Sequence, residues 1–241
     1  MRFRVGALPC FAPLALAVLI LAVAGARSLA EEPEGGEKRI IREAAGASKW
    51  ALLVGVEQYI HARPLSFCGR DAAALRERLL GLGFPERHIY LLHDGAEARK
   101  NEPYGSNIED AIELLLGKLS EDGTRLEREG LVGRGDMVVI GLSGHGVHSE
   151  GTSYFCPIDA RLDRPASLIS MAKLYRLLEL SPADVKLMLI DACRNDPRPE
   201  SEKSLEPTEE SERLARALLA PPKGILVLSS CSPGQVSIED E

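Results

Sequence analysis

Short apolar runs alternate with helical segments along the chain, and this alternation limits the fold more than any other feature. The runs have the length and composition of strands buried on both faces. Between them, small and branched apolar residues recur at helical spacing, as in Ala72, Leu75, Leu79 and Leu80. We expect strands at Trp50–Val56, His88–His93, Asp136–Leu142, Tyr154–Cys156, Val185–Asp191 and Ile225–Ser229, and helices at Asp71–Leu80, Ser106 to about Leu119, and Met171–Leu180. Such an order predicts right-handed crossovers and an α/β, three-layer sandwich with a mostly parallel sheet.

Two of the predicted strands lead into residues with catalytic chemistry. MVVIGL precedes the sequence SGHGVHS around His145, and VKLMLI precedes DACRND around Cys193. If these strands are neighbours, both residues lie just beyond strand ends, where open α/β sheets form their sites. A cysteine attacks as the thiolate and an imidazole can take its proton, so the pair is a candidate nucleophile and base. The alternatives are a buried structural cysteine and a histidine in a glycine-rich turn.

The small residues around the candidate pair suit acyl transfer. Gly144 and Gly146 flank the histidine and would let a substrate carbonyl approach closely. The backbone N–H groups of Gly146 and Cys193 are the expected oxyanion donors, because such sites usually pair two backbone donors. A peptide or amide is the substrate that this arrangement predicts.

The N-terminus resembles an export signal. Arg2 and Arg4 precede an unbroken apolar run from Phe11 to Gly25, and small residues at 28–30 come just before two glutamates. We therefore expect a signal peptide over residues 1–30, a flexible lead-in over 31–47 and an exported, periplasmic or extracellular protein. An uncleaved membrane anchor is the alternative, although the run is short for a membrane span.

Charge and cysteine content exclude some partners and leave others open. The formal charge is −7, and loss of residues 1–30 removes three arginines and no acids, which argues against nucleic acid or an anionic membrane as a partner. No CxxC pair occurs, and no spacing suits zinc. A disulfide among Cys68, Cys156 and Cys231 remains open. A thiol nucleophile outside the cytoplasm would also need protection from oxidation.

The two motifs and their surroundings resemble the caspase and metacaspase superfamily. SGHG followed by DACR is similar to the paired histidine and cysteine motifs of that superfamily. Asp191 and Asn195 stand where animal caspases have Gln and Gly, so the resemblance is to metacaspase-like and bacterial caspase-domain proteins. WALLVGVEQY, FCGRDA, the segment from Gly83 to Asp94, and LSSCSPGQ extend it over most of the chain. It implies a caspase-like domain over residues 48–241, with Cys193 as nucleophile and His145 as base.

The resemblance also implies an acidic pocket for the residue before the scissile bond. The matching positions are Cys68 and Asp71 in CGRD, Ser143 and Asp191. Two carboxylates in one pocket would bind a guanidinium or ammonium group, which implies cleavage after Arg or Lys. From the residues alone, a helix N-cap is the favoured interpretation of Asp71, and a turn residue after a strand is the favoured interpretation of Asp191.

Residues 197–213 are almost entirely Pro, Ser, Glu, Lys and Arg, and predict a mobile linker. We expect either self-cleavage there, at Arg198, Lys203 or Arg213, or a simple solvated spacer. No cofactor is expected. Calcium activates some metacaspases, but no ligand set can be assigned to it here.

The sequence leaves two functions open. Family members usually continue beyond LSSCSPGQ with a Gly- and Phe-containing segment that this chain lacks, so we expect the final edge strand to be missing. The first function is a secreted cysteine endopeptidase that cleaves after Arg or Lys with a Cys/His dyad. The second is a non-proteolytic caspase-like module that acts in binding or as a scaffold, inactive through this truncation.

Overall fold

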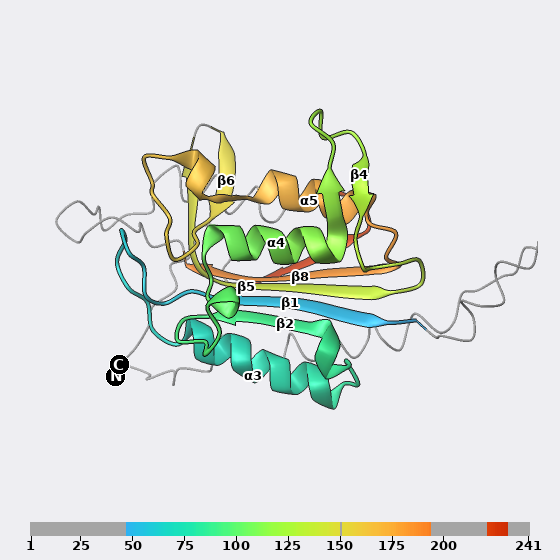
Figure 1. Ribbon diagram of the computed structural model, residues 1–241, viewed down its shortest axis with the longest axis horizontal. Coiled ribbons are helices and arrows are strands. Elements are labelled where there is room, and N and C mark those ends of the chain that lie inside the picture. Colours follow the sequence, from blue (N-terminus) through green and yellow to red (C-terminus); the bar gives the residue numbers. More distant parts are fainter. Residues whose placement is uncertain (1–46, 150, 194–220, 231–241) are drawn as a thin grey trace, which may run out of the picture.

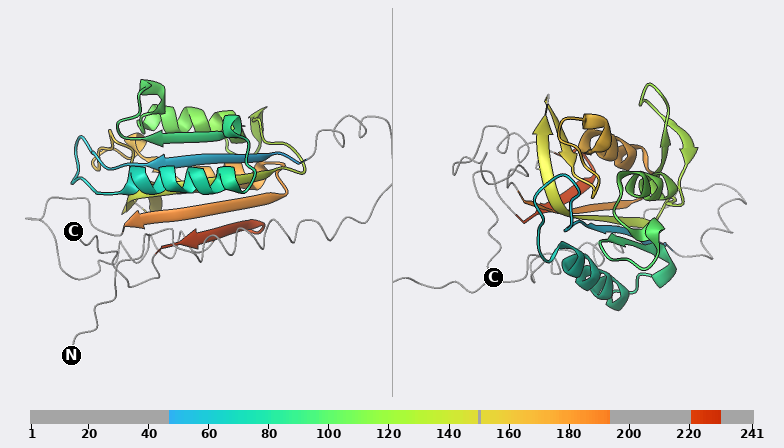
Figure 2. Two further views of the ribbon diagram at one scale, coloured as in Figure 1. Left: turned by 90° about the horizontal axis from the view of Figure 1, so that it is seen from below. Right: turned by 60° about the vertical axis from the view of Figure 1, so that its left-hand side comes forward.

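Five parallel strands form the centre of the molecule, as the alternation of apolar runs predicted. The computed structural model describes residues 47–149, 151–193 and 221–230. The parallel strands stand in the order β2–β1–β5–β8–β9. Their bounds are Lys49–Gly55 (β1), Ile89–His93 (β2), Met137–Ser149 (β5), Val185–Cys193 (β8) and Ile225–Ser229 (β9). All five run the same way, so their carboxyl ends meet at one edge of the sheet (Figure 2).

Helices cover both faces of the sheet and make it a three-layer structure (Figure 1). α3 (Cys68–Gly81) packs on one face, and α4 (Gly105–Leu116) and α5 (Met171–Leu180) pack on the other. Alternate strand residues point to opposite faces. Leu53, Val139 and Leu187 therefore meet Leu75 and Leu79 of α3 in one buried cluster. The strand residues that alternate with these point to the other face and form a larger buried cluster under α4 and α5. The predicted mostly parallel α/β fold is confirmed.

Short elements complete the described part of the chain. They are the 3₁₀ turns Glu86–His88, Arg99–Asn101 and Pro165–Ser167, a β3–β4 hairpin (Gly117–Leu119 and Leu126–Glu129), β6 (Thr152–Phe155) and β7 (Ile169–Ser170). β6 lies between β5 and β7 in an antiparallel group. The prediction of a short strand near Tyr154 is therefore confirmed. A strand so short is typical of a sheet edge, but β6 is paired on both sides.

The helix predicted at Met171–Leu180 is confirmed, but the other two predicted helix starts are wrong because contacts from distant residues decide them. α3 begins at Cys68, after Phe67 at φ 76°, and the Glu57 carboxylate accepts the Gly69 N–H at 2.7 Å. Asp71 thus lies within the first turn and is not the N-cap.

The sequence Ser106-Asn107-Ile108-Glu109 has the pattern of a capping box for the next helix, but this capping box does not form. α4 starts at Gly105, whose N–H donates to the Asp159 carboxylate at 2.8 Å. The Asn107 side chain instead donates to the carbonyls of Arg99 and Glu102. The helix ends at Leu116, short of the predicted Leu119, because Gly117 has a φ of 99° and begins β3.

β5 is longer than predicted, and this changes where the histidine lies. The expected strand ended at Leu142, with His145 in a loop beyond it. The strand instead continues to Ser149, because residues 146–149 pair with β6. β8 likewise continues to Cys193. Both candidate catalytic residues lie inside strands, and the prediction of two loops is wrong.

Several predictions fall outside the described residues. They are the signal peptide (1–30), nearly all of the lead-in (31–47), the linker (197–213), the final edge strand and any role of Cys231. Among the residues that the structure describes, no helix has both the length and the apolar character needed to cross a membrane.

Gly55 is predicted to be essential to the close packing of α3 on β1. A Cβ at this position would lie 2.4 Å from the carbonyl oxygen of Cys68, which is backbone and cannot move aside alone. Gly55→Ala should therefore lower the free energy of unfolding by about 1–3 kcal/mol, measured by urea denaturation. Gly81→Ala is the control, because nothing lies within 4 Å of its added Cβ. A Gly55→Ala protein as stable as Gly81→Ala would contradict the packing described.

Candidate active site

The register of β5 on β8 brings the two motifs together. His145 stands beside Cys193, and two residues earlier Ser143 stands beside Asp191. Residues two apart on a strand share a face of the sheet, and so do register partners on parallel neighbours. All four positions therefore lie on one face at the carboxyl edge. For Cys193 the structure describes the backbone only.

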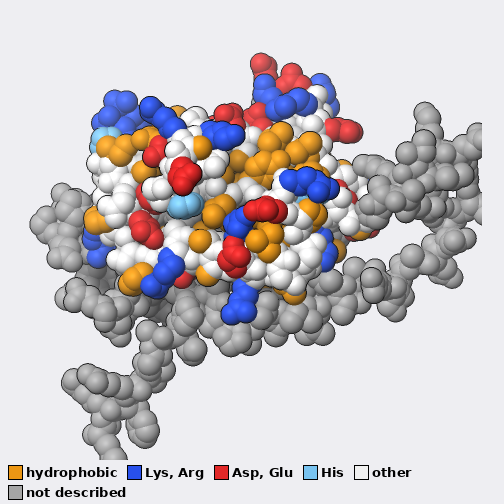
Figure 3. Space-filling model, turned by 60° about the horizontal axis from the view of Figure 1, so that its bottom comes forward, with side chains coloured by type: hydrophobic (Ala, Val, Ile, Leu, Met, Phe, Trp, Pro, Cys, Tyr) orange, Lys and Arg blue, Asp and Glu red, His pale blue; other side chains and the backbone are white. Residues whose placement is uncertain are grey.

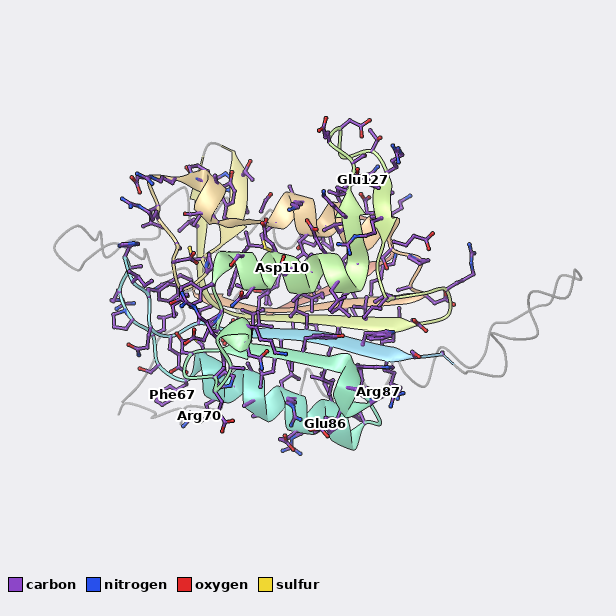
Figure 4. The ribbon with its side chains drawn as sticks, in the orientation of Figure 1. Phe67, Arg70, Glu86, Arg87, Asp110 and Glu127 are labelled. Atoms are coloured by element: carbon purple, nitrogen blue, oxygen red, sulfur yellow. The ribbon has the colours of Figure 1, made fainter. Side chains whose placement is uncertain are left out.

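That face is the one covered by α3. An added Cβ at Gly141, two residues before Ser143, would contact Leu75 of α3. Gly55 is the register partner of Ser143 on β1, and the start of α3 lies directly against it. Buried Cys68 and half-buried Asp71, both in the first turn of α3, thus lie at the same end of the sheet as Ser143 and Asp191, although Cys68 packs in the cluster under α4 and α5. The fold brings the four predicted pocket positions to one end of the sheet. Figure 4 shows nearby Phe67 and Arg70 at this end of the molecule.

Asp191 is held by a residue that the sequence did not indicate. Its side chain is only 5% exposed, and its Oδ1 accepts a hydrogen bond from Ser230 Oγ at 2.5 Å. Ser230 follows β9, and its N–H donates to the Ile190 carbonyl at 3.1 Å. A charge-assisted bond of this kind orients the carboxylate. The hydroxyl of Ser143 is also buried, and no described residue bonds to it.

The imidazole of His145 is fully buried and oriented by a backbone carbonyl. Its Nε2 lies 2.8 Å from the carbonyl oxygen of Arg63. A carbonyl only accepts, so Nε2 must carry the proton. In the neutral ring Nδ1 then carries the lone pair and is the atom that can act as a base. Sequence reasoning missed Arg63, because any residue type can supply a carbonyl.

Tyr59 makes a second contact to the same histidine. Its hydroxyl oxygen accepts the backbone N–H of His145 at 2.7 Å, and the two rings lie 4.6 Å apart at a 36° tilt. Burial, with a smaller contribution from Cys156, raises the pKa of Tyr59 well above its usual range. The phenol therefore stays protonated. A polar aromatic residue soon after a predicted strand was the available signal for it.

The ladder between β5 and β6 sets the direction of the Gly146 N–H. The His145 carbonyl accepts the Cys156 N–H at 2.9 Å, so the next pair, Gly146 with Phe155, is a non-hydrogen-bonded pair. The Gly146 N–H consequently points away from β6, on the side of β5 where β8 lies. This direction is compatible with the predicted oxyanion donor.

The described cysteines outside the motif are not joined to each other. Cys68 and Cys156 are both buried, and neither takes part in a disulfide with a described residue. Burial raises the pKa of the Cys156 thiol to about 12, so it is protonated at neutral pH and is a poor nucleophile. Within the described ranges, no group of three or more His, Cys, Asp or Glu residues could hold a metal ion.

A cavity of about 660 Å³ lies away from these residues. It runs along the edge strand β2 and is walled by α4, with Leu92, Ala111 and Leu114 among its apolar lining residues. Hydrophobic side chains gather between charged ones on the face that carries β2 and α3 (Figure 3). None of the predicted site residues lines the cavity.

Comparisons with known proteins agree with this geometry. The fold is that of an α/β protein with a mostly parallel sheet, in which a histidine and a cysteine are register partners on adjacent strands at the carboxyl edge. A family model described as the caspase domain of peptidase C14 matches residues 48–241. The chain therefore belongs to the caspase-domain family of cysteine peptidases. No curated protein matches the sequence significantly.

Among the solved structures that match is a protein from Geobacter sulfurreducens, which is 21% identical, with a TM-score of 0.41. The match covers 61% of this chain and 50% of that one, so this chain spans about half the length of its structural relative.

The burial of Cys156 predicts its reactivity. In the folded Cys193→Ala protein at pH 8, iodoacetamide should label Cys156 far more slowly than in urea, because a thiol with a pKa of about 12 has almost no thiolate at that pH. Peptide mass spectrometry of the two samples measures the difference. Equal labelling rates in the folded and the unfolded protein would show that Cys156 is not buried as described.

Proposed function

We propose that this protein is an endopeptidase that hydrolyses peptide bonds after Arg or Lys, with Cys193 as nucleophile and His145 as base. The observation that carries this proposal is the β5–β8 register, which sets His145 beside Cys193 and Ser143 beside Asp191. The first pair supplies the reacting groups, and the second supplies part of a pocket.

The chemistry follows from the tautomer of His145. Nε2 keeps its own proton, which it donates in a hydrogen bond to the Arg63 carbonyl oxygen. Nδ1 is therefore the ring nitrogen that takes the proton of the Cys193 thiol. The thiolate then attacks the scissile carbonyl carbon and forms a tetrahedral intermediate, whose oxyanion the N–H groups of Gly146 and Cys193 would stabilise. The imidazolium gives its proton to the leaving amine as the C–N bond breaks. Water then attacks the thioester, which releases the new carboxylate and restores the thiol.

Preference for a basic residue rests on the two carboxylates. Asp191 is nearly buried and oriented by Ser230, and Asp71 lies in the first turn of α3 at the same end of the sheet. Charged hydrogen bonds to a guanidinium would be strong there because little water competes. Ser143 Oγ and Cys68 complete the proposed lining.

Paired reporter peptides test the reaction and its preference. We expect a folded, reduced sample to cleave a peptide reporter that ends in Arg and to leave one that ends in Asp uncleaved. Cys193→Ala should be inactive with both. No turnover of either reporter by the wild type would favour the binding or scaffold alternative. Turnover of the Asp reporter alone would overturn the acidic pocket.

Asp191→Asn tests the pocket separately. Hydrogen bonds to charged groups contribute about 1.5–3 kcal/mol, so kcat/KM for the Arg reporter should fall by at least about ten-fold, mainly through KM. Asp163→Asn is the matched control, because Asp163 is exposed and pairs only with surface arginines. If both variants keep wild-type kcat/KM, Asp191 does not bind the substrate.

Two further proposals concern residues outside the described ranges. Export is supported by the basic, apolar and small-residue order of residues 1–30. Recovered protein should then begin at Glu31, which N-terminal sequencing measures.

Self-cleavage in the linker is supported by Arg198, Lys203 and Arg213. The wild type, but not Cys193→Ala, should then split into two chains on a denaturing gel after long incubation.

A further inference from the structure

The loop between β1 and α3 holds His145 at two points. The Arg63 backbone carbonyl accepts a hydrogen bond from the ring Nε2 at 2.8 Å, and the Tyr59 hydroxyl oxygen accepts one from the backbone N–H at 2.7 Å. The loop is itself anchored at both the sheet and the turn after β6, because the Val56 N–H donates to the Ser143 carbonyl at 3.0 Å and the Ile60 N–H donates to the Ile158 carbonyl at 2.9 Å. It is therefore a fixed support for the histidine.

Tyr59 acts where β5 changes partners. Up to His145 the strand pairs with β8, and from Gly146 it pairs with β6. In a regular antiparallel ladder His145 and Cys156 would exchange two backbone hydrogen bonds. The Cys156 N–H does donate to His145, but the His145 N–H donates to the Tyr59 hydroxyl. A side chain thus accepts the backbone bond at the branch point.

The residue before the histidine is fitted to this contact. A Cβ on Gly144 would lie 2.7 Å from the Tyr59 hydroxyl oxygen and 3.1 Å from the ring of Phe155. Any larger residue would push the phenol away from the His145 N–H. Gly144, the first glycine of the GHG motif, is therefore required sterically, because only a residue without a side chain leaves room for the Tyr59 hydroxyl.

We propose that Tyr59 is a positioning residue for proton transfer, which fixes the backbone and the ring plane of His145 while Arg63 fixes the tautomer. The inference rests on the proposed function, in which His145 is the base. Tyr59 is buried behind the histidine, at 9% exposure, and acts through it. Its loss should therefore lower the rate of the chemical step and leave binding of the basic side chain intact.

Tyr59→Phe is the direct test, because it keeps the ring and removes the accepting oxygen. We expect kcat for the Arg reporter to fall by about ten- to a hundred-fold with KM nearly unchanged, since small misplacements of a reacting group cost rates of that order. Tyr90→Phe, on strand β2, is the matched control and should keep wild-type kcat. Thermal unfolding of each variant reports any loss of fold.

Alkylation of Cys193 gives a readout that does not need substrate turnover. A thiol that shares its proton with a positioned imidazole reacts at lower pH than an ordinary thiol. The pH dependence of iodoacetamide labelling at Cys193 should therefore move toward higher pH in Tyr59→Phe and stay unchanged in Tyr90→Phe.

Gly144→Ala supplies a second variant if Tyr59→Phe folds poorly. It displaces the same hydroxyl and should reproduce the kcat loss, and the double variant should lose less than the product of the two single losses, because both act on one contact. Wild-type kcat and an unchanged labelling profile in Tyr59→Phe, with an active wild type, would overturn the role of Tyr59 alone. A wild type that cleaves no reporter and labels like an ordinary thiol would overturn the proposed function and this inference together.

Discussion

The hydrogen-bonded register between β5 and β8 is the constraint on which the rest of the site depends. A shift of one residue would move His145 away from Cys193 and Ser143 away from Asp191 at the same time, because both pairs belong to one ladder. The register is held by a two-sided core, with apolar residues of both strands buried under α3 on one face and under α4 and α5 on the other. The geometry of the site is therefore stabilised mainly by the burial of apolar core residues, which take no part in the proposed chemistry.

The sequence predicted the core strands well, because their apolar runs are set locally. It gave both ends of α5 and β9 correctly, but failed at the element ends that contacts from distant residues decide. The Glu57 carboxylate meets the start of α3, the Asp159 carboxylate meets the start of α4, and pairing with β6 carries β5 past its predicted end at Leu142. None of these contacts leaves a periodic signal in the sequence.

The same division holds at the site. His145, Cys193 and the four pocket positions could be named because reactive and charged side chains are visible in a sequence and match family motifs. Arg63 could not, since it contributes a backbone carbonyl that any residue could offer. Ser230 lies beside Asp191 because β9 pairs with β8, and the order of strands in a sheet cannot be read from the residues themselves. The supporting contacts could thus be identified only from the structure, whereas the candidate catalytic and pocket residues could be identified from the sequence.

The loop that supports His145 also leads into the pocket. It leaves β1 at Val56, contacts the histidine through Tyr59 and Arg63, and enters α3 at Cys68, whose carbonyl lies over Gly55. One continuous stretch of main chain, about a dozen residues long, therefore contacts the histidine and also begins the helix beside Gly55. In the proposed function, substrate recognition and proton transfer would depend on this same stretch, so binding energy from the substrate side chain could help to hold the imidazole in place.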